Sequence, residues 1–265
     1  MGHRRSPGRW TRASGRNEAV QREIPNGDGP GGVESIVLAD RWRAVAEAIW
    51  PARCIGCERR GTPLCDACRR QLPYLSDGAC HRCGARLRAR GVCRGCRRLW
   101  SALSSVRAPF SYEGAARTAV LTLKFRSGRY LAPLMGEFLR EAVRVRPVQA
   151  DVIVPIPLAR ARLRQRGFNQ AQLLAEQVAG AVGGVVVADA LERQERLPQQ
   201  TLTAKERLRN LSGAFSCPRP GAVLARRVLL VDDVVTTGAT LSACADTLAE
   251  AGAARLTALA FARNL

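Results

Sequence analysis

A strand-like apolar run that ends in two acids and a loop of small and hydroxylic residues most constrains this fold. Residues 228–231 read Val-Leu-Leu-Val, without polar alternation, which is typical of a central parallel strand buried on both faces. Asp232 and Asp233 follow, and residues 236–240 read Thr-Thr-Gly-Ala-Thr. Such residues let the backbone approach a ligand closely and open a helix, whose free N–H groups suit a phosphate. Because two carboxylates would repel a bare phosphate, we expect a ligand that also carries hydroxyls, such as a phosphorylated ribose.

This order of residues resembles the 5-phosphoribosyl-1-pyrophosphate loop of the type I phosphoribosyltransferases. The resemblance implies that Asp232 and Asp233 hold the 2′ and 3′ hydroxyls of the ribose. It also implies that the 5-phosphate is bound by Thr236, Thr237, Gly238, Ala239 and Thr240. The alternative interpretation is a strand-to-helix turn of another α/β fold, in which the threonines only cap the helix.

Four Cys-x-x-Cys pairs precede this region and have the spacing of zinc ligands. They are Cys54/Cys57, Cys65/Cys68, Cys80/Cys83 and Cys93/Cys96. Each pair presents two thiolates to one ion, and two pairs complete a tetrahedral site, so the eight thiols predict two zinc ions. A closed tetrathiolate leaves no position for water, which makes both ions structural. Pairing of neighbouring Cys-x-x-Cys knuckles is the simplest assignment, with interleaved pairing as the alternative. Disulfides or a redox pair are the competing chemistries.

The composition changes along the chain and suggests three parts. Residues 1–35 mix Arg, Gly, Ser and Pro with few apolar residues, which predicts a disordered tail or, alternatively, a misplaced start codon. Residues 36–50 carry apolar positions at helical spacing, so we expect an amphipathic helix there, with a membrane-surface or partner-binding helix as the alternative. The helix and the double zinc ribbon together occupy 36–100. An α/β domain with a mainly parallel sheet is expected over 101–265.

The net charge of +20 bears on partners. It favours phosphate-rich ligands, including single-stranded DNA, although arginine-heavy usage also results from coding bias. No run approaches the ~20 apolar residues of a membrane span, and no signal peptide is visible, so we expect a cytoplasmic protein.

Further basic residues flank other predicted elements. Residues 151–157 form an apolar strand interrupted by prolines, and Arg160, Arg162, Arg164 and Arg166 follow it. In a phosphoribosyltransferase the loop after this strand holds pyrophosphate, and a solvated basic turn is the alternative. Lys205 lies in a polar stretch, 187–215, which corresponds either to a loop that closes over the pyrophosphate or to a surface insertion. Lys124 and Arg126 end a short helical pattern, where they are either solvated or reach the ligand.

Together these motifs resemble the ComF/GntX family. The resemblance is carried by Arg-Leu-Arg-Gln-Arg-Gly-Phe-Asn-Gln at 162–170, by residues 200–210, by the Asp-Asp loop and by the double zinc ribbon, and it covers about 38–265. It implies a double zinc ribbon fused to a type I phosphoribosyltransferase domain. It also implies links to DNA uptake in natural competence and, in some relatives, to gluconate use.

The resemblance supports three functional hypotheses. The first is a competence-type protein that binds a ribose phosphate such as phosphoribosyl pyrophosphate. The second is an active transferase in which Mg²⁺ bridges the substrate, Asp232 and Asp233 balance charge, and Lys205, Arg164 or Arg166 stabilise the departing pyrophosphate. The third is a catalytically silent platform for DNA or for proteins of the competence machinery. Thr236 stands where the 6-oxopurine enzymes carry an acid, which disfavours a hypoxanthine or guanine acceptor.

Overall fold

The computed structural model describes residues 52–75, 80, 82–83, 87, 91–99, 102–194 and 213–264. All of them belong to one unit, Pro51–Leu265. The predicted tail at 1–35, the predicted helix at 36–50 and Lys205 lie outside the described residues. In the parts that are described, no helix is long and apolar enough to cross a membrane.

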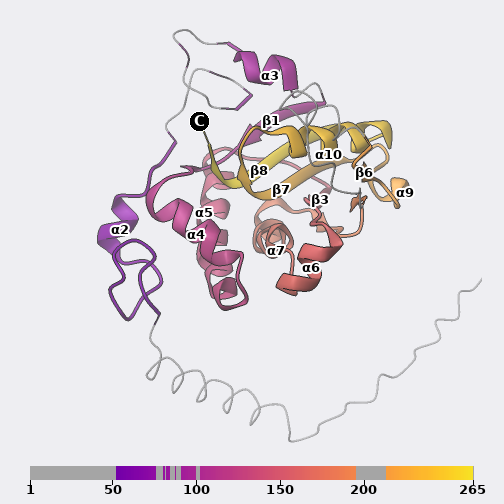
Figure 1. Cartoon of the computed structure of the whole chain (residues 1–265). Helices are drawn as coiled ribbons and strands as arrows, with labels where there is room; N and C mark the ends of the chain where they lie inside the picture. The colour runs from indigo at the N-terminus through magenta and orange to yellow at the C-terminus, as the bar shows by residue number, and fades with distance from the viewer. Residues whose placement is uncertain are drawn as a thin grey trace, which may run out of the picture. The chain divides into compact units, whose positions relative to one another are not determined.

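A six-stranded parallel sheet forms the centre of the unit (Figure 1). Its strand order is β1-β8-β7-β3-β4, and β2 also pairs with β8. The strands are β1 (Leu103–Arg107), β2 (Phe110–Ser111), β3 (Val152–Pro155), β4 (Val185–Val186), β7 (Arg227–Val235) and β8 (Arg255–Arg263). The expected apolar strand is therefore the middle of β7, and its position between β8 and β3 explains why it lacks polar alternation. The prediction of a mainly parallel α/β sheet is confirmed.

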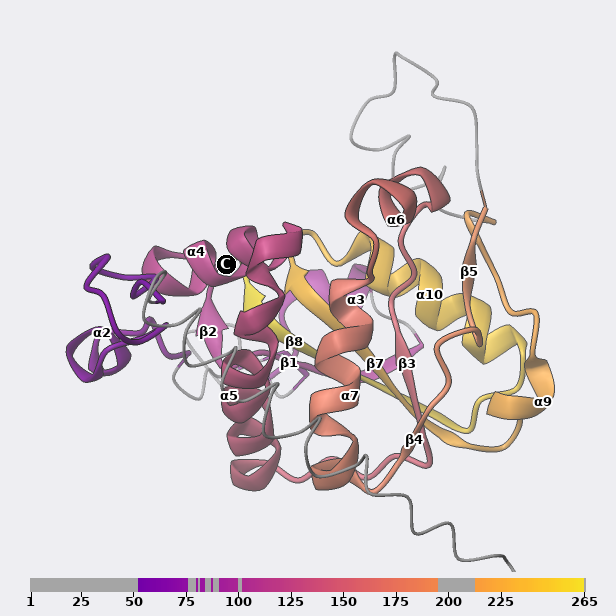
Figure 2. The same cartoon turned by 90° about the horizontal axis from the view of Figure 1, so that it is seen from below.

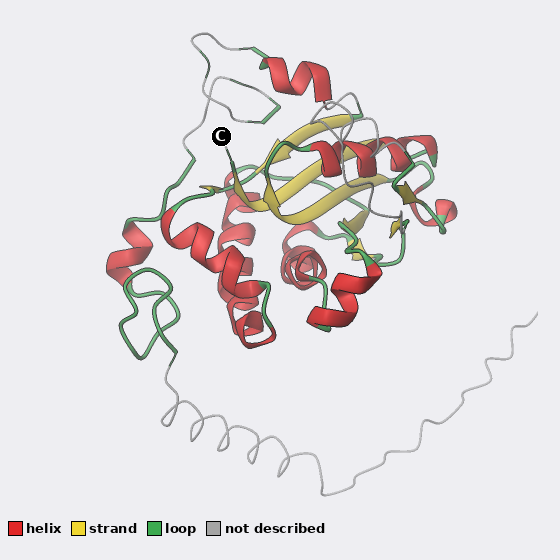
Figure 3. Ribbon diagram, in the orientation of Figure 1, coloured by secondary structure: helices red, strands yellow, loops and turns green. Residues whose placement is uncertain are grey.

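Helices cover both faces of this sheet (Figure 3). One face carries α4 (Gly114–Leu123), α5 (Ala132–Val145) and α7 (Gln170–Val182), and Figure 2 shows α5 and α7 side by side. The other face carries α10 (Ala239–Glu250). Because successive strand residues point to opposite faces, Leu229 and Val231 join the first core, while Val228 and Leu230 join the second.

Two local features shape these elements. Ala108 and Pro109 separate β1 from β2, because a proline cannot donate to a strand ladder. The sequence suggests a basic turn after β3, whereas residues Arg160–Arg166 form helix α6. Arg, Leu and Gln are strong helix formers, and Gly167 ends the helix in the left-handed region at φ 77°.

Short elements complete the domain. A 3₁₀ helix, η1 (Arg126–Leu131), joins α4 to α5, and α9 (Pro220–Val223) precedes β7. An antiparallel pair, β5 (Glu192–Arg193) and β6 (Phe215–Ser216), brackets the part of the polar stretch that is not described.

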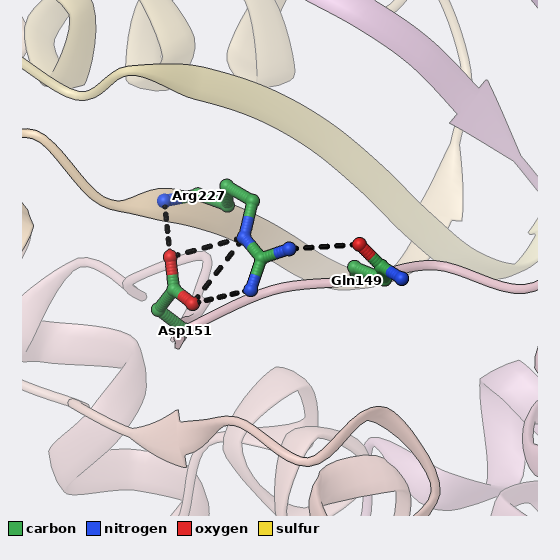
Figure 4. Close-up of polar contacts among 3 residues, drawn as sticks. All are labelled: Gln149, Asp151 and Arg227. Atoms are coloured by element: carbon green, nitrogen blue, oxygen red, sulfur yellow. Dashed lines mark hydrogen bonds and ion pairs between the residues drawn. The ribbon is translucent and has the colours of Figure 1, made fainter.

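An exposed ion pair ties the amino ends of β3 and β7 together (Figure 4). Arg227 donates from Nη2 to Asp151 Oδ1 over 2.6 Å and from its backbone N to Asp151 Oδ2 over 2.9 Å, and its Nη1 donates to Gln149 Oε1 over 2.8 Å. These bonds from Arg227 lower the pKa of Asp151 to about 2. The pair fixes the register of neighbouring strands at the end of the sheet opposite the acids.

The cysteine-rich segment packs into both cores of the α/β domain. Its described helices are α2 (Asp66–Arg70) and α3 (Arg94–Leu99). Cys54 and Cys65 belong to the core under α4 and α5, while Cys80 and Cys96 belong to the core under α10. The described part of the ribbon therefore contributes to both cores of the α/β domain.

Candidate functional site

The two acids lie at the carboxyl end of β7, the central strand. Asp232 is half-buried, and Asp233 is only 6% exposed. Strand alternation places Asp233 on the face covered by α7 and Asp232 on the face covered by α10. The backbone N–H of Asp233 donates to Asp232 Oδ1 over 2.8 Å. The carboxyl ends of parallel strands are where open α/β sheets bind ligands, so the acids have the position expected of a binding site.

Two side chains from distant elements converge on Asp233. Lys124, which caps the end of α4, places Nζ 3.5 Å from Asp233 Oδ2. Gln170, the first residue of α7, donates from Nε2 to the same oxygen over 3.3 Å. Lys124 therefore lies beside the acid pair, and its contact with a ligand stays a prediction. Gln170 was not among the predicted site residues, and the signal available was a polar residue on the otherwise apolar buried face of α7.

Gln170 is buried as well as positioned. It is 3% exposed, and its Oε1 has no hydrogen-bond partner within the described part of the chain. Its neighbour Asn169 caps α7 by accepting from Ala171 N over 3.0 Å, and it donates from Nδ2 to the carbonyl of Ile156 over 3.0 Å. The amino end of α7 is thus fastened to the carboxyl end of β3, which holds Gln170 against Asp233.

The electrostatics of the acid pair favour a ligand that donates hydrogen bonds or brings positive charge. Burial raises the pKa of Asp232 well above its usual range, and the charge of Asp233 raises it further. The Lys124 ammonium acts in the opposite direction. A ribose diol that donates to the carboxylates, or a cation beside them, would stabilise their ionised form and so offset the effects of burial and of charge repulsion.

The loop after β7 turns sharply into α10. Gly238 is the cap of α10 and has φ 78°, a left-handed conformation that glycine adopts without strain. Ala239 N donates to Thr237 Oγ1 over 3.4 Å. Thr236 and Thr237 are exposed, while Ala239 and Thr240 are half-buried. The first N–H groups of a helix lack intrahelical partners, so this end of α10 is suited to an anion.

The predicted pyrophosphate arginines lie on α6, which follows β3, the strand next to β7. Arg164 is exposed and Arg166 half-buried. Arg160 forms an ion pair with Glu192 of β5. Because α6 directly follows β3 in the chain, it lies beyond the carboxyl end of that strand. Lys205 and the side chain of Arg126 lie outside the described residues.

The eight thiols gather into two separate sets of four, in the order that pairing of neighbouring knuckles predicts. One set is Cys54, Cys57, Cys65 and Cys68, and the other is Cys80, Cys83, Cys93 and Cys96. Within each set all sulfurs lie within 4.8 Å of one another. The Cys57–Cys65 and Cys80–Cys96 sulfurs are 3.6 and 3.7 Å apart.

These spacings identify the metal that fits. A tetrahedral ion with zinc–sulfur bonds of about 2.3 Å places its sulfurs roughly 3.8 Å apart, whereas a disulfide requires about 2.05 Å. Burial raises the pKa of Cys54, but the backbone N–H groups of Cys65, Cys57 and Gly56 outweigh it and lower the value to about 6. Cys80 is likewise lowered to about 6 by N–H groups that include those of Cys93 and Cys83. Two structural zinc ions therefore fit the two sets.

Comparison with known families agrees with this architecture. The family model "Double zinc ribbon domain" matches residues 45–97, and "Phosphoribosyl transferase domain" matches residues 163–265. The fold and the thiol sets thus define a protein with a double zinc ribbon and a phosphoribosyltransferase-type α/β domain.

Comparison with individual proteins identifies the family within this class. Competence protein F of Haemophilus influenzae is 30% identical over 80% of this chain and 96% of its own length. DNA utilization protein YhgH of Salmonella typhi is 32% identical over 76% of this chain and 97% of its own. Among solved structures, glutamine phosphoribosylpyrophosphate amidotransferase of B. subtilis aligns at 21% identity over 50% of this chain and 26% of that chain, with a TM-score of 0.37. The chain belongs to the ComF/GntX family of competence proteins.

Proposed function

We propose that the carboxyl end of the sheet binds phosphoribosyl pyrophosphate or a closely related ribose phosphate. The observation that carries this proposal is the convergence of Lys124 and Gln170 on Asp233, directly before the glycine turn into α10. A site for a plain anion would not place two carboxylates there. A site for a plain cation would not need the unpaired N–H groups at the start of α10, which follows the acids. A ribose phosphate would use both the two carboxylates and the start of the helix.

Each group has a role in this proposal. Asp232 and Asp233 accept hydrogen bonds from the 2′ and 3′ hydroxyls. The backbone N–H groups and hydroxyls of residues 236–240 bind the 5-phosphate. Arg164 and Arg166 of α6, together with Lys205, face the pyrophosphate, whose planar oxygen edges match guanidinium forks. Mg²⁺ accompanying the ligand would neutralise pyrophosphate charge beside the two acids.

Catalysis is the second candidate for the same site. The position of α6 after β3 favours it, because cations there would stabilise pyrophosphate as it leaves. In that reaction the bond between C1 and the pyrophosphate oxygen breaks, and an acceptor nucleophile forms a new bond to C1.

The names of the relatives suggest the setting. Competence protein F and DNA utilization protein YhgH are named for the handling of DNA. We assign this chain the same kind of role: a cytoplasmic protein that acts on or beside incoming single-stranded DNA, with competence proteins as partners. The charge of +20 supports a polyanionic partner. The alternative is a catalytically silent platform that uses the same surfaces.

Isothermal titration of the zinc-loaded protein with phosphoribosyl pyrophosphate and Mg²⁺ tests the central proposal. Binding to the wild type that is lost in Asp232→Asn/Asp233→Asn is expected. A folded, zinc-replete wild type that gives no heat at millimolar ligand would reject the ribose-phosphate site and favour the silent platform.

A further inference from the structure

Two adjoining pockets form a groove between the zinc ribbon, strand β1 and helix α5. The first has a volume of about 230 Å³ and the second about 320 Å³, and both are lined by Tyr74, Phe138 and Glu141. We call their combined lining the arginine groove. Its arginines are Arg69, Arg82, Arg107, Arg140, Arg144 and Arg146. None of its lining residues belongs to the acid pair or to the loop before α10.

Tyr74 is a rigidly held aromatic surface within this groove. The residue is 57% exposed, yet its ring packs on the buried ring of Phe110 with centroids 4.8 Å apart. Phe110 in turn contacts Phe138 and Phe261 in the core. The backbone is fixed as well, because Leu75 N donates to the carbonyl of Pro109 over 2.8 Å. One face of Tyr74 is thus anchored to the core while much of the ring remains open to a planar ligand.

Positive charge dominates around this ring. The groove contains six arginines against two glutamates, Glu137 and Glu141. Glu137 pairs with Arg69 over 2.8 Å, and Glu141 with Arg144 over 3.5 Å.

Three other arginines bond to neutral oxygens. Arg82 donates to the carbonyls of Cys96 and Leu103, Arg107 donates to the carbonyl of Arg146 over 2.8 Å, and Arg140 donates to the carbonyl of Gln177 over 3.1 Å. Burial and the nearby charges of Arg146 and Arg255 lower the pKa of Arg107. An anion placed beside Arg107 would reduce the repulsion between these positive charges.

The apolar part of the groove lies next to these charges. Val106, Phe138 and the 70%-exposed Val145 line the first pocket together with Tyr74. A ligand that fits both parts combines flat, weakly polar groups with negative charge. Nucleobases joined by phosphates have this chemistry, and single strands expose their base faces while duplexes do not.

We propose that the arginine groove binds single-stranded DNA, with a base stacked on Tyr74 and phosphates on Arg107 and Arg146. This inference rests on the proposed DNA-handling role and locates it on a surface separate from the ribose-phosphate site. An acidic peptide would use the arginines but would not need an open aromatic face, so it is the less favoured occupant.

Fluorescence anisotropy with a labelled oligothymidylate tests the assignment in the full-length, zinc-loaded protein. Stacking on an aromatic side chain predicts that Tyr74→Ala weakens binding by about 5- to 150-fold and that Tyr74→Phe preserves it. Arg107→Gln and Arg146→Gln should each lower the slope of log affinity against log salt by about 0.7, the value for one phosphate contact in a single strand. Arg117→Gln, an exposed arginine of α4 outside the groove, is the matched control and should bind more weakly by less than about twofold.

The same variants separate this proposal from the ribose-phosphate proposal. Each should keep two zinc ions and wild-type titration with phosphoribosyl pyrophosphate, which also verifies folding. The groove proposal is overturned by a wild type that does not bind the oligonucleotide at low salt. It is equally overturned if Tyr74→Ala binds as tightly as the wild type, or if duplex DNA or polyglutamate competes as well as the single strand. None of these outcomes would affect the ribose-phosphate site.

Discussion

Lys124 Nζ lies 3.5 Å from Asp233 Oδ2, and this contact joins the end of α4 to the end of β7. Gln170 donates to the same carboxylate oxygen from α7. Asp233 is therefore held by two donors before any ligand arrives. The arrangement orients the carboxylate and keeps its charge compensated, as a binding site for a hydroxylated anion requires.

Replacement of Lys124 by methionine should weaken the binding of phosphoribosyl pyrophosphate. Methionine keeps the apolar stem but removes the charge, and loss of one charged contact, about 1.5 kcal/mol, corresponds to a roughly tenfold rise in Kd. Calorimetric titration measures the change. Lys124→Arg should retain most of the affinity, and Arg117→Gln on the same helix should retain all of it. Wild-type affinity in Lys124→Met would contradict the role given to this contact.

Replacement of Asp232 by asparagine should stabilise the fold near neutral pH while it weakens ligand binding. Burial and Asp233 raise the pKa of Asp232 in the folded state, so its ionisation opposes folding above the unfolded pKa of about 3.9. The variant should therefore show a higher Tm than wild type at pH 7, and the difference should vanish at pH 3. Thermal denaturation across this range is the measurement. A lower Tm at pH 7 would show that Asp232 is stabilised by its surroundings.

The exposed Asp151–Arg227 pair should contribute stability that depends on pH in the opposite sense. The pKa of Asp151 falls to about 2 in the folded protein, so its contribution is present above about pH 4 and is lost as the pH falls through 2. Arg227→Gln should lower the Tm at pH 6 and have a much smaller effect at pH 2. Arg226→Gln, one residue earlier, should have a smaller effect, because Arg226 acts on Asp151 through its charge alone whereas Arg227 also forms hydrogen bonds to it. Equal losses at both pH values would point to packing rather than charge.

Gly238 should resist substitution because of its left-handed backbone. Alanine at φ 78° costs roughly 1–2 kcal/mol of stability, and it would also move the N–H groups at the start of α10. We expect Gly238→Ala to lower stability and to raise the Kd for phosphoribosyl pyrophosphate. Gly183→Ala carries a similar strain at φ 77°, at the far end of α7, and should lower stability without affecting binding. Denaturant titration and calorimetry together distinguish the two effects.

The number of zinc ions bound per chain should depend on which of the two thiol sets is intact. Cys54→Ser/Cys65→Ser removes two ligands from one set and should leave one zinc per chain, whereas Cys54→Ser/Cys80→Ser damages both sets. Because Cys54 and Cys65 pack in the same core as α4, loss of the first ion should also weaken the site that Lys124 completes. Atomic spectroscopy gives the metal count, and ligand titration gives the second effect. Two ions retained in Cys54→Ser/Cys65→Ser would refute the assignment of the sets.

Much of the candidate site was readable from the sequence because its parts are contiguous. The apolar run before Asp232, the acids themselves and the glycine turn at Gly238 lie within a dozen residues, and each is dictated by local chemistry. The cysteine spacing likewise encodes two tetrahedral sites, since ligand type and interval reflect the geometry of the metal. The helix Arg160–Arg166 was not predicted, because the preceding prolines and the cluster of charges suggested a turn. The Arg, Leu and Gln residues of this segment nevertheless favour a helix.

The tertiary structure alone decided which distant side chains meet. Gln170 and Asp233 are 63 residues apart, and their contact depends on α7 being fastened to β3 beside β7. Tyr74 becomes a stacking surface only because Phe110 lies beneath it. No periodicity or spacing encodes such contacts, since they arise where separate elements cross. The sequence by itself determined the glycine turn after the acids and the two sets of thiols, while the packing of helices on the sheet determined which distant side chains meet beside them.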